Sequence, residues 1–273
     1  MKRILAVLLI GAMTLVGCGA AESGKEEGKQ VEESKDTQSD LAYVEDKGKL
    51  AIGYTIYEPM NFLDEDGELT GFETEFAEAV CEKLGVEPEF TEIAWDSKVI
   101  ELDAKNIDCI WNGMTITDEL KEAISISNPY VKNMQVLVVK KDSGVTGTKD
   151  LVGKTVAVEA GSAAIAAVEG DENLSQAEML TVAKQTDALV EVKAGTSDAA
   201  VLDWTLANSM LGENTDFAEL QMVEGVELSL EEYGIGLRKD SDLKTEIDKI
   251  MAELIADGTL PELAKEYGLN LVK

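Results

Sequence analysis

Residues 155–203 read TVAVEAGSAAIAAVEGDENLSQAEMLTVAKQTDALVEVKAGTSDAAVLD, and this stretch decides the fold. Three apolar runs have the length of buried strands: residues 155–159, 178–182 and 199–202. Helical patterns separate them, the first opened by Gly161 and Ser162 and the second covering residues 186–194. Strands that alternate with helices are typical of parallel sheets in an α/β fold. The sequence therefore predicts an α/β protein.

The alternation extends along the chain in both directions. Extended patterns occur at residues 49–54, 89–93, 107–112, 134–140 and 227–237. Helical patterns occur at residues 72–84, 96–105, 117–123, 204–211, 243–257 and 260–267. Thr117 has the side chain of a helix N-cap, and Asn128-Pro129-Tyr130 requires a loop before the strand at 134–140. Two α/β units joined by a hinge fit this pattern better than one sheet.

The N-terminus carries an export signal. Lys2 and Arg3 precede an apolar run at residues 4–16, which is too short to span a bilayer as a mature helix. Its ending, Leu15-Val16-Gly17-Cys18, resembles a bacterial lipobox, so we expect removal of residues 1–17 and acylation of Cys18. The alternative is an ordinary secretory signal with an incidental cysteine. Residues 18–40 contain almost no apolar side chains and predict a disordered linker behind the lipid.

Charge and composition exclude several classes of function. The formal net charge is −30 and no basic patch occurs, which argues against nucleic acid and against anionic lipid surfaces as partners. The chain has no His, which excludes His-based triads, His general bases and His-ligated zinc. We therefore expect no metal and no cofactor. Cys81 and Cys109 fit small buried apolar positions, although an exported protein also permits a disulfide between them.

Several motifs together carry a family resemblance. They are Leu50-Ala51-Ile52-Gly53, Tyr57-Glu58-Pro59-Met60-Asn61-Phe62, Gly67-Glu68-Leu69-Thr70-Gly71-Phe72-Glu73, Gly113-Met114-Thr115-Ile116-Thr117-Asp118-Glu119, Ser127-Asn128-Pro129-Tyr130, the run at 151–158, Asp203, and Gly236-Leu237-Arg238-Lys239. In this order, from about residue 49 to the end, they resemble the extracytoplasmic solute-binding proteins of ABC importers for polar amino acids, bacterial solute-binding protein family 3.

The resemblance implies a two-lobed clamshell of the type II periplasmic-binding-protein class, with two hinge strands. Lobe one is expected at residues 41–132 and 231–273, and lobe two at residues 133–230. A ligand that contacts both lobes favours the closed state, which an importer can distinguish from the open one. The implied protein is a monomer that is lipid-anchored on the extracytoplasmic face of the cell membrane and delivers its ligand to an ABC permease. The acidic linker and the run at 107–113 resemble Gram-positive members.

The resemblance also implies the binding residues. Tyr57 is expected to cover the ligand and Trp95 to form a second wall, where stacking or cation–π contact is available. Ordinary core packing is the alternative for Trp95, while Trp111 and Trp204 are expected in the core or at the cleft rim. Further ligand contacts are expected on two loops and at the end of one strand: Asn112, Gly113, Met114 and Thr115; Gly161, Ser162 and Ala163; and Asp203. Asp203 is expected to hold an ammonium group, or to cap the following helix.

One position departs from the family pattern. Leu120 stands where such proteins usually carry an Arg that binds the ligand α-carboxylate. Three explanations stay open: the ligand has no free carboxylate, another cation such as Lys121 or Lys132 reaches in, or the carboxylate is bound by a differently built site.

Two other classes remain as alternatives. A dehydratase-like enzyme on the same fold would need a carboxyl acid in the cleft, and Glu58 and Glu159 are the nearest candidates, although both are expected to face solvent. A non-transport surface lipoprotein would close on no small molecule. We therefore expect a binding protein without catalytic residues.

Overall fold

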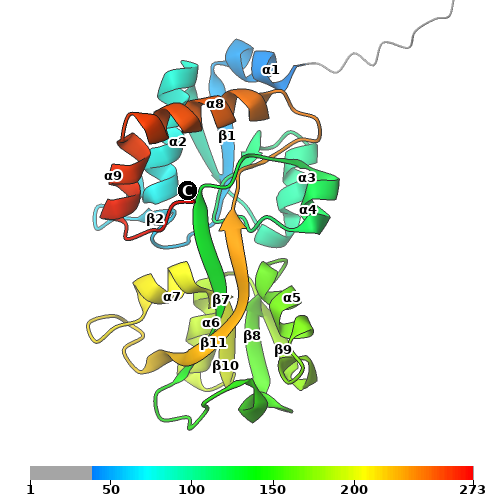
Figure 1. Cartoon of the computed structure of the whole chain (residues 1–273), viewed down its shortest axis with the longest axis vertical. Helices are drawn as coiled ribbons and strands as arrows, with labels where there is room; N and C mark the ends of the chain where they lie inside the picture. Colours follow the sequence, from blue (N-terminus) through cyan, green and yellow to red (C-terminus); the bar gives the residue numbers. More distant parts are fainter. Residues whose placement is uncertain (1–38, 273) are drawn as a thin grey trace, which may run out of the picture. The chain divides into compact units, whose positions relative to one another are not determined.

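Two five-stranded sheets, each with its own helices, organise the chain (Figure 1). This computed structural model describes residues 39–272, so the expected signal peptide, Cys18 and most of the expected linker lie outside the described residues. The described part forms a single compact unit. We name its two halves lobe one, which holds the sheet containing β1, and lobe two, which holds the sheet containing β8. No helix in residues 39–272 has the length and apolar character needed to cross a membrane.

The sheet of lobe one has the strand order β4-β1-β5-β12-β6. Its strands are β4 (Glu87–Glu92), β1 (Lys49–Tyr54), β5 (Cys109–Ile110), β12 (Gly236–Leu237) and β6 (Ser125–Ile126). β1 runs parallel to β4 and β5, while β12 is antiparallel to β5 and β6. Its helices are α1 (Asp40–Lys47), α2 (Phe72–Leu84), the 3-10 helix η1 (Trp95–Ser97), α3 (Lys98–Asp103), α4 (Asp118–Ala123), α8 (Leu243–Ala256) and α9 (Thr259–Glu266). A small hairpin joins β2 (Phe62–Leu63) to β3 (Leu69–Thr70).

The sheet of lobe two has the strand order β11-β7-β10-β8-β9. Its strands are β11 (Leu220–Tyr233), β7 (Val131–Lys140), β10 (Ala199–Asp203), β8 (Thr155–Glu159) and β9 (Glu178–Val182). Its helices are α5 (Ala163–Gly170), α6 (Gln185–Ala194), α7 (Trp204–Met210) and the 3-10 helices η2 (Thr148–Leu151) and η3 (Leu174–Gln176). β8 is parallel to β9 and β10, which confirms the predicted β/α alternation. β7, however, is antiparallel to both of its neighbours.

β7 and β11 are the two strands that run between the lobes (Figure 1). They pair with each other from Val131 and Tyr233 at the lobe-one end to Lys140 and Leu220 in lobe two. At the lobe-one end, Val131 bridges Leu271 and Tyr233 bridges Thr115. Two irregularities interrupt the pairing on either side of Glu227. One chain crossing leads into lobe two and the other leads back, which explains why these strands are antiparallel.

Helix α2 shows how local sequence builds the core of lobe one. Phe72, Phe76 and Val80 recur at helical spacing and are fully buried. Gly85 ends the helix in the left-handed conformation at φ 72°, with its N–H bonded to the carbonyls of Cys81 and Glu82. The Phe76 ring meets Trp111 edge-on at 4.9 Å. This packing places α2 beneath the loop that follows β5.

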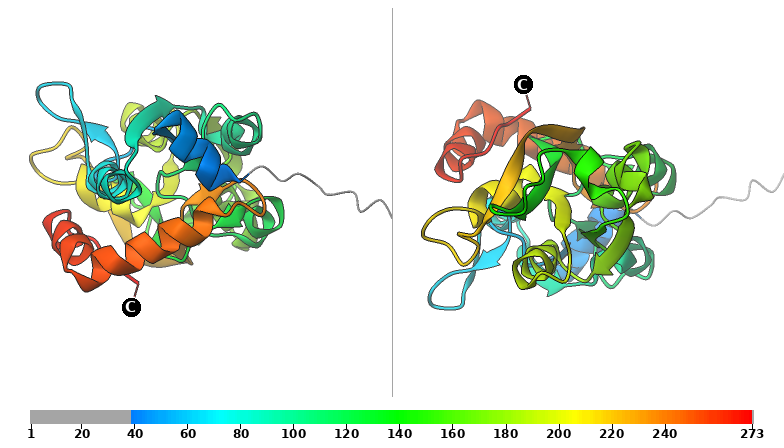
Figure 2. Two further views of the ribbon diagram at one scale, coloured as in Figure 1. Left: turned by 90° about the horizontal axis from the view of Figure 1, so that it is seen from above. Right: turned by 90° about the horizontal axis from the view of Figure 1, so that it is seen from below.

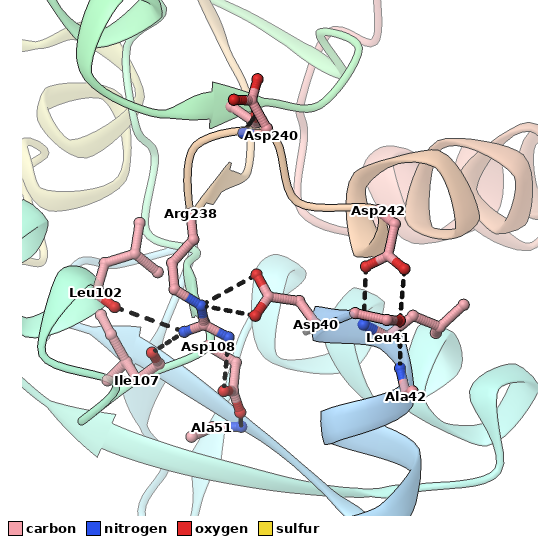
Figure 3. Close-up of polar contacts among 12 residues, drawn as sticks. Asp40, Leu41, Ala42, Ala51, Leu102, Ile107, Asp108, Arg238, Asp240 and Asp242 are labelled. Atoms are coloured by element: carbon pink, nitrogen blue, oxygen red, sulfur yellow. Dashed lines mark hydrogen bonds and ion pairs between the residues drawn. The ribbon is translucent and has the colours of Figure 1, made fainter. Parts of the chain in front are cut away.

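A buried ion cluster fixes α1 to lobe one (Figure 3). Arg238 donates from Nε to both carboxylate oxygens of Asp40 at 3.0 Å, and from Nη2 to Asp108 at 3.2 Å. It also donates to the carbonyl of Ile107 at 2.9 Å. Asp242, just before α8, accepts from the N–H of Leu41 at 3.0 Å. The N-terminal helix is thus held by residues from the far end of the sequence.

Seen from above, α1 and α8 cover the outer end of lobe one (Figure 2). The sequence did not predict α1, because its eight residues bury only Asp40 and Val44. Asp40, the last residue of the expected linker, is therefore the first residue of a helix.

Candidate ligand-binding cleft

A cavity of about 610 Å³ lies between the lobes at the carboxyl ends of their strands. Nine of the ten expected binding residues line it: Trp95, Asn112, Gly113, Met114, Thr115, Gly161, Ser162, Ala163 and Asp203. Trp95 follows β4, the 112–115 loop follows β5, Gly161 follows β8, and Asp203 ends β10. Strand ends from both sheets therefore build one site. Tyr57 is not among the described residues that line the cavity.

Tyr57 lies behind the cavity wall, contrary to its expected position over the ligand. Its ring packs against Gly113, where a Cβ would overlap the ring, and its hydroxyl pairs with that of Tyr233 at 2.6 Å. Burial raises the Tyr57 pKa well above its ordinary value, and the nearby charge of Asp203 adds to the rise. Tyr57 thus supports the loop and Asp203 from behind.

Asp203 is buried, with only 4 % of its surface exposed. One oxygen accepts from the amides of Asn133 (2.8 Å) and Gln135, and the other accepts from Gln185 at 2.6 Å. Its side chain makes no capping bond to α7, so the capping role is absent from the described contacts. Burial raises the Asp203 pKa, and the surrounding hydrogen bonds offset part of the rise. A cation in the cavity would stabilise this carboxylate.

Gln135, which the sequence did not single out, lies beside Asp203. The antiparallel register of β7 and β10 pairs the two residues. Its Nε2 donates to Asp203 and, at 3.0 Å, to Glu231. Because the amide nitrogen serves two carboxylates, the oxygen must point the other way, and this buried Oε1 has no partner among the described residues. Buried acceptors in proteins normally have a donor, so this oxygen can accept a further hydrogen bond.

Glu231, on β11, belongs to the same network. It accepts from Thr115 at 2.9 Å and from Asn133 at 3.1 Å, and burial raises its pKa to about 7. The Thr115 hydroxyl therefore donates to a carboxylate, which leaves its lone pairs available to a ligand donor. Asn133 and Gln135, both on β7, connect Glu231 to Asp203.

The 112–115 loop is held mainly by protein contacts. The N–H of Gly113 donates to Glu73 at 2.8 Å, and Glu73, whose pKa burial raises to about 7, also accepts from Tyr130. The Asn112 side chain bonds to Thr55 through both of its polar atoms. These groups form part of the cavity wall, and they already make hydrogen bonds to other protein groups.

Lys98 and Glu159 also line the cavity, and the sequence predicted neither in this position. Lys98, the first residue of α3, was not predicted as a site residue. Glu159 was expected to face solvent, which is wrong: it ends the buried strand β8 and is 4 % exposed. Burial and then the charge of Asp203 raise the Glu159 pKa to about 8, although Lys98 lowers it. Glu58 is partly buried and accepts from Ser209 at 3.0 Å.

The two lobes touch each other beside the cavity. Lys98 donates to the Gly161 carbonyl at 2.9 Å, and Lys184 of lobe two pairs with Glu92 of lobe one at 2.6 Å. At Gly161 a Cβ would come within 2.7 Å of the Asp96 Cα, so the two lobes touch through backbone here. Gly161 also has φ +70°, which favours glycine. The Ser162 hydroxyl donates to the Glu159 carbonyl at 2.8 Å.

The other residues considered from the sequence lie in the cavity wall, in the core or in a second cavity. Trp95 both lines the cavity and packs in a core cluster, whereas Trp111 is fully buried in the core. Trp204, Lys121 and Lys132 line a different cavity of about 1120 Å³ beside β7 and β11. Cys81 and Cys109 are buried and unpaired with each other.

Comparisons with known proteins agree on one family. The model of the bacterial extracellular solute-binding proteins, family 3, matches residues 50–270. The arginine-binding extracellular protein ArtP of Bacillus subtilis is 31% identical and covers 98% of each chain. The L-cystine-binding protein TcyJ of Escherichia coli is 33% identical over 85% of this chain and 88% of its own. A crystal structure of an ArgBP mutant from T. maritima superposes with a TM-score of 0.77 at 35% identity, covering 84% of this chain and 98% of that one.

Proposed function

Because the chain belongs to the bacterial extracellular solute-binding proteins of family 3, we propose that it binds a polar amino acid between its lobes for an ABC importer. Relatives named for arginine and cystine binding support an amino acid as the ligand. Their names describe binding proteins, which supports binding without chemical conversion. The function is thus to capture a solute outside the cytoplasm and deliver it to a permease.

The pairing of Asp203 with Gln135 is the observation that carries this proposal. The Asp203 carboxylate and the unpaired Gln135 oxygen are both acceptors, and both residues line the cavity. An ammonium group supplies the positive charge that the first needs and the hydrogen-bond donors that both need. Thr115 adds a third acceptor at the same wall. We assign these residues to the ligand's amino group.

We further propose that residues 41–132 and 231–273 move as lobe one and residues 133–230 as lobe two. The paired strands β7 and β11 then form the hinge. The contacts of Lys98 with Gly161 and of Lys184 with Glu92 are made only when the lobes are closed. A ligand that bridges the same surfaces stabilises that state.

The proposed location is the outer face of the cell membrane of a Gram-positive cell, with a lipid on Cys18. The motif ending at Cys18 supports this location, and the linker at residues 18–40 supplies reach toward a permease. We propose that the protein acts as a monomer, because one chain supplies both sides of the cavity.

A thermal-shift and calorimetric screen with free amino acids tests the proposal. A true ligand raises the unfolding temperature in proportion to ln(1 + [L]/Kd). Asp203→Asn removes the charge from the ammonium site and is expected to weaken binding by about 30-fold or more, since breaking a buried charge pair costs 2–5 kcal/mol. The control is Asp142→Asn, the same change at an exposed position. Binding of no amino acid by the unaltered protein would refute the proposed function.

A further inference from the structure

Lys98 is the only cation among the described residues that line the cleft cavity. The same walls carry five acids: Asp96, Glu119, Glu159, Glu169 and Asp203. Lys98 is also unusual in its burial: 8 % of its surface is exposed, whereas lysines are almost never buried without a partner. A charged side chain held in this way needs an explanation.

The surroundings of Lys98 satisfy its charge only in part. Its Nζ donates to the carbonyls of Trp95 (3.1 Å) and Gly161 (2.9 Å) and lies 4.6 Å from the centre of the Trp95 ring. No carboxylate of the described residues lies within ion-pair distance of it. An ammonium has three N–H donors, so one remains for a further acceptor. Burial lowers the Lys98 pKa, and the charge of Glu159 counteracts this effect.

The position of Lys98 complements the ammonium site. Lys98 comes from α3 of lobe one, while Asp203 ends β10 of lobe two, and both face the same cavity. An α-amino acid carries a carboxylate and an ammonium, so it can occupy both sites only when the lobes are closed. Leu120, also in the cavity wall, packs with the apolar cluster of Trp95 and Met114 and offers no charge.

We propose that the ε-ammonium of Lys98 binds the ligand's carboxylate. This inference rests on the proposed function and extends it: the ligand class is α-amino acids with a free carboxylate, and the matching decarboxylated amines are rejected. Of the three explanations for Leu120, a different cation is therefore the one that we favour, although that cation is neither Lys121 nor Lys132.

Matched ligand pairs test the inference. L-Arginine, L-histidine and L-cystine are titrated calorimetrically beside agmatine, histamine and cystamine, which lack only the carboxylates. The variants are Lys98→Met, which keeps the length of the side chain without its charge, and Lys149→Met, the same change at an exposed position. We expect the unaltered protein to prefer the amino acid of at least one pair. Lys98→Met should lose about 30-fold or more for that amino acid. It should lose clearly less for the amine, whose binding is affected only through the lost contact of Lys98 with Gly161.

The outcomes separate the two proposals. Amino acid binding by Lys98→Met within twofold of the unaltered protein would overturn the role of Lys98 and leave the proposed function standing. Equal losses for the amino acid and its amine would also overturn it, because they indicate a structural role. Binding of the amines alone by the unaltered protein overturns the inference too, whereas binding of no amino acid in the wider screen refutes the proposed function itself.

Discussion

Substitution of Gly161 by Ala tests whether closure of the cleft is required for binding. The new Cβ would lie 2.7 Å from the Cα and 3.1 Å from the Cβ of Asp96. Asp96 belongs to lobe one and Gly161 to lobe two, so the clash exists only when the lobes are closed. Because backbone atoms of Asp96 are involved, a side-chain rotation cannot relieve it.

The expected magnitude follows from two separate costs. Ala at φ +70° is strained by about 1–2 kcal/mol in open and closed states alike, so this strain lowers the stability of the fold. Overpacking of the closed interface adds about 1–3 kcal/mol, which corresponds to a loss of affinity of about 5- to 150-fold. Binding is therefore expected to weaken although neither charged site is altered.

Gly153→Ala is the matched control. Gly153 has φ +72°, but a Cβ there meets nothing within 4 Å. It should lose similar stability in urea unfolding and retain full affinity in calorimetry. Small-angle scattering with saturating ligand should show a larger radius of gyration for Gly161→Ala than for Gly153→Ala. Equal affinities of the two variants would refute the requirement for contact at this point.

Other predictions concern the fold, pH dependence and the anchor. Arg238→Met should lower the free energy of unfolding by about 3–5 kcal/mol in urea, because it leaves the buried Asp40 without its cation, whereas Asp108 keeps its ion pair with Lys47. Its ligand affinity should not change, since Asp108 precedes β5 and the binding loop follows it. Glu159 keeps its proton up to about pH 8 in the fold but releases it near 4.5 when unfolded, so this group makes stability fall as pH rises between these values. Glu159→Gln should reduce the total loss of unfolding free energy over this pH range by at most about 5 kcal/mol. An unchanged pH dependence would contradict the raised pKa of Glu159. Cys18→Ala should shift the protein from the membrane fraction to the medium in cell fractionation.

Much of the fold was predictable because its strands are local apolar runs. β8, β9 and β10 show this, with α5 and α6 between them. The antiparallel direction of β7 was not predictable, since it depends on where the chain crosses between lobes. β2, β3 and β6 are two residues long, which is too short for any periodicity. Helix α1 depends on Arg238 and Asp242, about 200 positions away.

The cavity wall was predicted better than the groups inside it. Strand ends indicated the loops that carry Gly113, Gly161 and Asp203, because parallel strands present their carboxyl ends at one edge. Lys98 lies in a helical pattern where a lysine normally indicates a solvated face, and only the tertiary fold directs it inward. Gln135 did leave a signal: it is the one polar residue before the terminal Lys140 in the strand at 134–140.

The ion cluster around Arg238 has a mechanical consequence. A force applied through the backbone before Ser39 reaches α1 first. The bidentate pairing of Arg238 with Asp40 then transmits this force to the rest of lobe one. The chain enters and leaves lobe two through the paired strands β7 and β11. A molecule tethered at its N-terminus would consequently be held through lobe one, while lobe two stays free to move relative to it. Movement of lobe two on ligand binding would then place no load on the tether.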